Sequence, residues 1–105
     1  MADFMNLLQQ AQQMQQRLQQ LQEELATKTV TATAGGGMVT VEADGRGQVT
    51  RVRIDPSIVS PDDVEMLEDL VAAGVREAQK QAAALAQEEM KRATGGLNLP
   101  FPPGQ

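Results

Sequence analysis

The sequence predicts an α+β fold in the order α-β-β-β-α, with a three-stranded antiparallel meander between two long helices. Residues 3–26 repeat apolar side chains at helical spacing, residues 28–55 alternate and carry glycine turns, and residues 60–93 hold a second helical stripe. The chain of 105 residues fits one domain, residues 1–96, followed by a flexible proline-rich tail, residues 97–105.

The first helix is expected over residues 3–26. Its apolar side chains recur at alternating intervals of three and four, which is the heptad spacing of a helix that packs against another helix. Most of the remaining positions are Gln, a good helix former without charge. The seam fits packing within its own domain and packing across a dimer equally well. It consists of Phe4, Leu7, Ala11, Met14, Leu18, Leu21 and Leu25.

Three strands are expected over residues 29–34, 38–43 and 48–54, because apolar and polar residues alternate there. Three consecutive glycines, residues 35–37, predict the first turn. Asp44-Gly45-Arg46-Gly47 predicts a hairpin between the second and third strands, because Asp-Gly tolerates positive φ at little cost.

The alternation also predicts which face of this hairpin is buried. One face is expected to be core, and it consists of Val39, Val41, Thr50, Val52 and Ile54. The other face is expected to be solvated, and it consists of Thr40, Glu42, Arg51 and Arg53.

The second helix is expected from Ser60, whose hydroxyl can accept a hydrogen bond from the amide of residue 63. Pro61 suits a first helical position, and Asp62 and Asp63 face the positive end of the helix dipole. The glycines at 95–96 end the helix. About 30 residues give a length of about 45 Å, so its stripe must meet a helix, a sheet or another subunit. The stripe consists of Val64, Leu67, Val71, Gly74, Val75, Ala78, Ala82 and Leu85.

The composition predicts a thin aliphatic core, because the chain has two Phe and neither Trp nor Tyr. Small domains with thin cores are often completed by oligomerisation, so we expect an obligate homodimer. The residues expected to pack in the dimer or between helices are Leu7, Met14, Leu18, Leu21, Val71 and Val75.

No catalytic constellation is visible in the sequence. The chain lacks Cys and His, and its triple glycine is not followed by the Gly-Lys-Ser/Thr of a phosphate-binding loop. Four aspartates, Asp44, Asp55, Asp62 and Asp63, already have roles in turns or helix caps. We therefore expect no enzyme activity, cofactor, metal or small-molecule substrate. The absence of a secretion signal and of a membrane-spanning run predicts a cytoplasmic protein.

The net charge of −5 argues against a uniformly basic surface. Arg51 and Arg53 fit a solvated sheet face balanced by Glu42. Arg76 and Lys80 are like charges four residues apart on the helix side opposite the apolar stripe. A phosphate backbone would relieve their repulsion, although ordinary solvent exposure accounts for them as well.

Several motifs together resemble the YbaB/EbfC family of bacterial nucleoid-associated proteins. The glycine turn continues as Met38-Val39-Thr40-Val41, Val52-Arg53-Ile54-Asp55-Pro56-Ser57 follows the hairpin, and Met66-Leu67-Glu68-Asp69-Leu70 and Thr94-Gly95-Gly96-Leu97 come later. The resemblance covers nearly the whole chain. It implies a tweezer-like homodimer with a shared β hub that binds double-stranded DNA with little sequence selectivity. It also implies altered DNA conformation, with roles in nucleoid organisation, gene regulation and DNA protection.

The resemblance places DNA binding on the helices. The family usually carries several lysines on the first helix, where this sequence has Gln and a lone Arg17. The residues expected to contact DNA are Arg17, Arg76, Lys80, Lys91 and Arg92. The alternative is a dimeric helical protein-interaction module that does not bind DNA, which the acidic balance and the Gln-rich first helix would suit. Salt-dependent retardation of DNA by the protein distinguishes the two.

Overall fold

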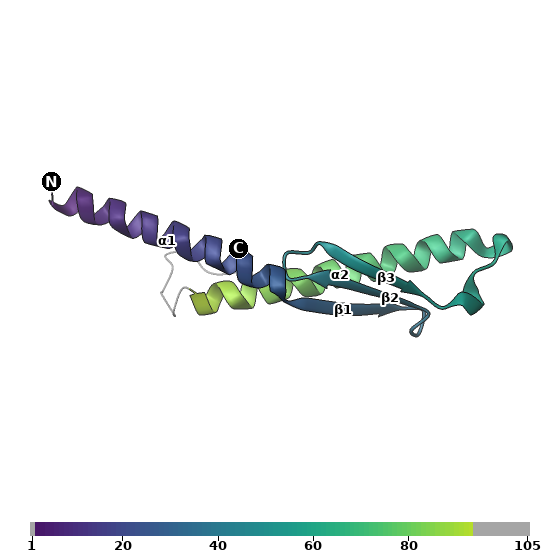
Figure 1. The fold of residues 1–105 in the computed structure, drawn as a ribbon. Coiled ribbons are helices and arrows are strands. Elements are labelled where there is room, and N and C mark those ends of the chain that lie inside the picture. Colours follow the sequence, from purple (N-terminus) through teal and green to yellow (C-terminus); the bar gives the residue numbers. More distant parts are fainter. Residues whose placement is uncertain (1, 94–105) are drawn as a thin grey trace.

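The computed structural model describes residues 2–93, which form two helices and one sheet in the predicted order α-β-β-β-α (Figure 1). The expected tail, residues 97–105, and the helix stop at 95–96 lie outside the described residues. The elements are α1 (Ala2–Thr27), β1 (Thr29–Ala34), β2 (Val39–Asp44), β3 (Val49–Ile54), two 3₁₀ turns (Pro56–Ile58 and Pro61–Asp63) and α2 (Val64–Ala93).

The molecule is elongated, with extents of 71 × 25 × 18 Å. α1 projects away from one end of the sheet, while α2 runs along one face of the sheet and ends on the side from which α1 leaves (Figure 1). The sheet is antiparallel, in the order β1-β2-β3. Because α1 leaves the sheet, most of its length has no other part of the described chain to pack against.

The register of the hairpin matches the prediction at one end and departs from it at the other. Val39 pairs with Ile54 and Val41 with Val52, as the alternation requires. A bulge then sets Ala43 opposite Val49. The prediction that Thr50 lies in the core is therefore wrong. Val49 packs against the core instead, while Thr50 is exposed and its hydroxyl donates to the carbonyl of Glu42 at 3.2 Å.

The core lies between α2 and the first two strands. Val39, Val41 and Ala43 of β2 are completely buried, and small residues of α2, among them Gly74 and Ala78, face them. The two elements approach so closely that a Cβ on Gly74 would lie 2.8 Å from Cγ2 of Val41. This close approach is possible only because the side chains of α2 at the contact are small.

The third strand is left largely uncovered. α2 contacts β1 and β2 extensively and β3 little. Val52 and Ile54 lie on the predicted face, yet they are 40% and 36% exposed. The prediction that they are core residues is wrong for the described chain alone, because no element covers that half of the sheet.

The apolar seam of α1 divides into a buried end and an exposed arm. Leu21 and Leu25 are buried where α1 meets the rest of the domain. Phe4 and Leu7, by contrast, are 61% and 63% exposed, and Met14 and Leu18 are exposed as well. Packing within its own domain thus accounts for only the last turns of the helix.

The connections follow the predicted turn chemistry with two differences. The three glycines form the predicted turn between β1 and β2, and all three have positive φ. The Ser60 hydroxyl accepts from the amide of Asp62 at 3.3 Å, not from that of residue 63. In the second hairpin the positive φ belongs to Gly47, whereas Gly45 is needed because a Cβ there would lie 2.7 Å from the Leu25 carbonyl oxygen.

Asp44 organises the second hairpin. Asp44 is only 7% exposed, and its Oδ1 accepts hydrogen bonds from the amides of Arg46 at 2.9 Å and Gln48 at 3.1 Å. The Gln48 amide, then the amide and guanidinium of Arg46, hold the pKa of the Asp44 carboxyl below its usual range, against the opposing effect of burial. The Ser57 amide similarly lowers the pKa of Asp55. Both groups act as ionised hydrogen-bond acceptors in turns.

The close approach of α2 and β2 predicts that the effect of Gly74→Ala on stability changes sign when the Val41 side chain is shortened. In the wild type, Gly74→Ala should destabilise the protein, since overpacking costs about 1–3 kcal/mol and exceeds or cancels the ~1 kcal/mol gain in helix propensity. In a Val41→Ala background the obstructing Cγ2 is gone, so Gly74→Ala should stabilise by up to about 1 kcal/mol. Urea unfolding of the four proteins measures the coupling. Equal effects of Gly74→Ala in both backgrounds would contradict the close approach.

The lowered pKa of Asp44 predicts a pH-dependent effect of Asp44→Asn. A carboxyl whose folded pKa lies below its ordinary value of 3.8 stabilises the protein above that pH, and this contribution is lost as pH falls through the folded pKa. Asp44→Asn should therefore destabilise most at pH 7 and progressively less below pH 3.8. Denaturant unfolding of both proteins between pH 7 and pH 3 tests this, and a constant difference would mean that ionisation is unimportant.

Candidate nucleic-acid interface

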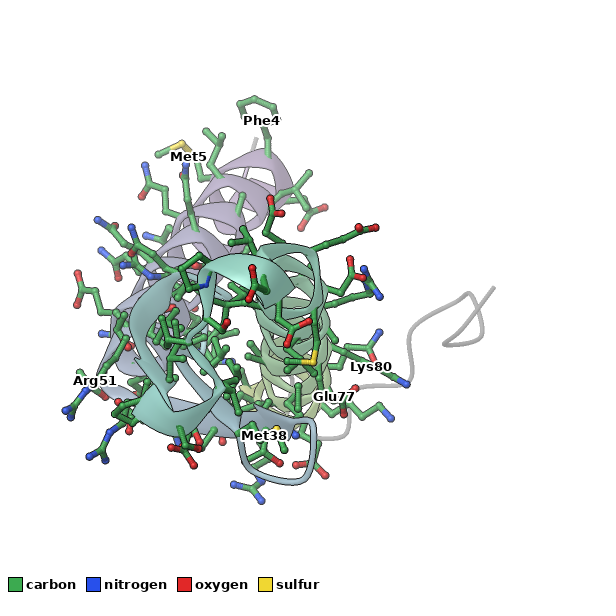
Figure 2. The ribbon with its side chains drawn as sticks, turned by 90° about the vertical axis from the view of Figure 1, so that its right-hand side faces the viewer. Phe4, Met5, Met38, Arg51, Glu77 and Lys80 are labelled. Carbon is green, nitrogen blue, oxygen red and sulfur yellow. The ribbon has the colours of Figure 1, made fainter. Side chains whose placement is uncertain are left out.

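Two of the predicted DNA contacts lie on the outer side of α2. Arg76 and Lys80 are exposed, one turn apart, on the helix whose other side packs on the sheet through Gly74 and Ala78. Figure 2 shows Lys80 pointing away from the sheet on the same side as Glu77. Within residues 2–93, neither cation forms an ion pair or a side-chain hydrogen bond. No ion pair in the described chain therefore offsets their mutual repulsion, and the nearest carboxylate in the sequence is that of Glu77.

Arg17 and Arg92 lie together at a second place, beside a hollow of ≈ 280 Å³ between α1 and α2. The hollow is also lined by Glu24 and Glu89. Arg92 Nη1 is 3.4 Å from Oε1 of Glu89, so this cation is already paired. Lys91 is exposed at the same end of α2 and also has an interaction partner.

Lys28 also takes part in this cluster, although nothing in the sequence predicted it. Lys28 Nζ lies 3.2 Å from the same Glu89 oxygen that Arg92 contacts. Glu89 thus ties the junction between α1 and β1 to the last turns of α2. The pairing joins residues 61 positions apart, so no local pattern signals it.

Arg51 and Arg53 are exposed on the sheet, as predicted, but the expected balance of their charge by Glu42 does not take the form of an ion pair in the described chain. Arg51 is the register partner of Glu42 on the solvent face of the sheet, but within residues 2–93 no ion pair joins them. Arg53 pairs in register with the uncharged Thr40. A signal was present in the sequence: residues 28–54 carry four of the nine basic residues and two of the fourteen acidic ones.

The predicted packing residues separate into two sets. Leu21 is buried, and Val71 and Val75 are partly buried against the core of the same chain. Leu7, Met14 and Leu18 are exposed along α1, and Figure 2 shows Phe4 and Met5 at the far end of the same helix. This second set is available to a partner.

The part of the chain between residues 2 and 93 holds no group of three His, Cys, Asp or Glu side chains suited to a metal ion. Over the same residues, neither helix combines the length and apolar character needed to cross a bilayer.

Comparison with known proteins identifies the family. The profile of the YbaB/EbfC DNA-binding family matches residues 1–97. A nucleoid-associated protein of Gemmatimonas aurantiaca is 48% identical over 99 residues, which cover 94% of this chain and 95% of the relative. One from Thermoanaerobacter pseudethanolicus is 52% identical over 95 residues, covering 90% and 86%.

A solved structure supports the same assignment. The crystal structure of the uncharacterized protein HP0035 from Helicobacter pylori superposes with a TM-score of 0.63 at 25% identity, covering 83% of this chain and 98% of that one. The likeness therefore extends over both helices and the sheet. The chain belongs to the YbaB/EbfC DNA-binding family.

Proposed function

We propose that this protein is a homodimeric nucleoid-associated protein that binds double-stranded DNA with little sequence selectivity and alters its conformation. The observation that carries the proposal is the match of the DNA-binding family over residues 1–97, together with relatives named as nucleoid-associated proteins. Association with the nucleoid, within the cytoplasm, follows from that role. So do contributions to nucleoid organisation, gene regulation and DNA protection.

The exposed apolar surface supports the homodimer. The arm of α1 shows Phe4, Leu7, Met14 and Leu18 to solvent. Most of the stability of a helix in a protein comes from the packing of its amphipathic face, and monomers rarely expose large apolar patches. A second copy of the chain presents the same heptad seam, so the two arms can cover each other.

The charge distribution along α2 supports DNA contacts by Arg76 and Lys80. Three of the six acidic residues of α2 lie in its first two turns, whereas all four of its cations lie further along, where the other three acidic residues also lie. These cations are Arg76, Lys80, Lys91 and Arg92. From residue 76 to residue 91 the helix rises about 22 Å, and phosphates recur about every 3.4 Å of axis on one strand. Contacts to phosphates carry no base information, which accounts for weak selectivity.

The alternative, a helical interaction module that does not bind DNA, is not favoured. The features that support this alternative are the exposed apolar seam of α1 and the net negative charge of the chain. Both features are also expected of a DNA-binding dimer, because an acidic chain can bind DNA through cations that lie apart from most of its anions, and the family is a DNA-binding one.

The dimer proposal predicts that polar substitutions on the exposed arm dissociate the protein without unfolding the monomer. Leu7→Gln with Leu18→Gln should raise the dimer dissociation constant strongly, because these side chains are 63% and 40% exposed in the single chain. Gln12→Ala with Gln19→Ala, on the other side of α1, is the control. Light scattering after size exclusion measures the mass. A wild type that stays monomeric at micromolar concentration would refute the proposal.

The DNA-binding proposal predicts that Arg76→Gln with Lys80→Gln weakens binding equally on unrelated duplexes. The slope of log K against log salt should fall in magnitude by about 0.9 for each phosphate that the variant no longer neutralises. Arg46→Gln is the control, because Arg46 is already 3.6 Å from Asp44 in the hairpin. Affinity is titrated against salt after each variant is shown to be a folded dimer. An unchanged slope in the double variant would show that the DNA does not contact the middle of α2.

A further inference from the structure

The side of the sheet that faces away from α2 is a polar surface with two arginines. It is called the outer sheet face, and it consists of Thr29, Thr31, Thr33, Thr40, Glu42, Arg51 and Arg53. The strand register aligns these side chains in rows across the sheet. One row runs Thr33–Thr40–Arg53 and the next runs Thr31–Glu42–Arg51.

The segment that forms the sheet and its turns carries a net positive charge in an acidic protein, and two of its cations, Lys28 and Arg46, lie outside the strands and pair with carboxylates. Residues 28–54 hold four of the nine basic residues and two of the fourteen acidic ones, whereas α1 and α2 each hold more acidic than basic residues. One of those two acids, Asp44, is buried and engaged with Arg46. Glu42 is therefore the remaining carboxylate on the outer sheet face.

The two arginines of this face have no partner in residues 2–93. Lys28, Arg46 and Arg92 each lie within 4.0 Å of a carboxylate, but Arg51 and Arg53 do not, and neither makes a hydrogen bond through its side chain. They stand two positions apart on one strand, a separation of about 6.8 Å. Like charges at this distance repel each other, and an anion placed over them removes that penalty.

The donor set matches a phosphate backbone. Guanidinium groups bind phosphate oxygens in a forked geometry, and threonine hydroxyls are common donors to the sugar–phosphate backbone. The separation of the two arginines spans about two phosphate repeats of 3.4 Å along one strand of a duplex. An extended polyanion can contact both arginines and the threonine rows at once.

The outer sheet face and the side of α2 that carries Lys80 lie on opposite sides of the molecule. Figure 2, which views the molecule along its length, shows Arg51 and Lys80 pointing away from each other on opposite sides, with the sheet and α2 between them. We infer that the outer sheet face is a second DNA-contact surface, which takes a different duplex from the one held by α2. One protein then bridges two duplexes. The inference rests on the proposed DNA binding and deepens it.

The test is a capture experiment with the dimer. Protein is loaded on a bead-bound duplex, and retention of a second, labelled duplex of unrelated sequence is measured. Arg51→Gln with Arg53→Gln should bind the first duplex through α2 yet retain the second no better than beads without protein. Arg51→Lys with Arg53→Lys keeps the charge and should retain the second duplex, which also controls for folding. Glu42→Gln removes the competing carboxylate and should increase retention.

A salt titration gives a second measurement on the same surface. In the Arg76→Gln/Lys80→Gln background, adding the two Arg→Gln changes on β3 should lower the slope of log K against log salt by about 1.8 more, at about 0.9 per phosphate. Adding Arg46→Gln in their place should leave the slope as it was. A fall of this size confined to the β3 changes supports the inference.

The outcomes separate the inference from the proposed function. If the wild type retards DNA but captures no second duplex, or if the Arg51→Gln/Arg53→Gln variant captures it as the wild type does, the second surface is refuted and DNA binding stands. A second duplex lost equally in the Lys variant also refutes it, because charge is then not the cause. A wild type that retards no DNA refutes both. Binding of an acidic peptide to the outer sheet face with no effect on duplex capture would assign this surface to a protein partner instead.

Discussion

The close approach of α2 to β2 determines the rest of the architecture. Gly74, Ala78 and Ala82 present almost no side chain, so the helix approaches Val39 and Val41 until a single Cβ would collide. From this position α2 contacts β1 and β2 extensively and β3 little, so Val52 and Ile54 remain uncovered. The arm of α1 is likewise left without a packing surface in the described chain. The single chain is thus an incomplete core, which argues for a second copy.

The periodic part of this architecture was predictable from the sequence, because its determinants are local. Alternation placed the strands, positive-φ glycines placed the first turn, and the spacing of three and four placed both helices. The bulge that exchanges Thr50 for Val49 was not predictable, since the Asp44 hairpin sets it by hydrogen bonding and not by alternation. The exposure of Val52 was also hidden, because it depends on which strands α2 covers.

The candidate site was predictable to a smaller extent. The helical wheel correctly placed Arg76 and Lys80 on the exposed side of α2. It did not reveal that Glu89 binds both Lys28 and Arg92, since that bridge joins segments far apart in the sequence. The expected balance of Arg51 by Glu42 relied on strand neighbours attracting each other. Adjacent positions in a register do not guarantee an ion pair, because the two side chains need not point toward each other.

Segregation of charge is what reconciles an acidic protein with a DNA-binding family. Glu89 and Asp44 neutralise the cations near the α1 junction and the hairpin, where the fold itself uses them. Within residues 2–93, no ion pair engages Arg76 and Lys80 in the middle of α2 or Arg51 and Arg53 on the outer sheet face, and Figure 2 shows Lys80 and Arg51 on opposite sides of the molecule. The Gln-rich arm of α1 adds no strong field of either sign, with Arg17 its lone cation. Such an arm suits the proposed pairing with another copy, and the proposed attraction to DNA then depends on the cations of α2 and the sheet.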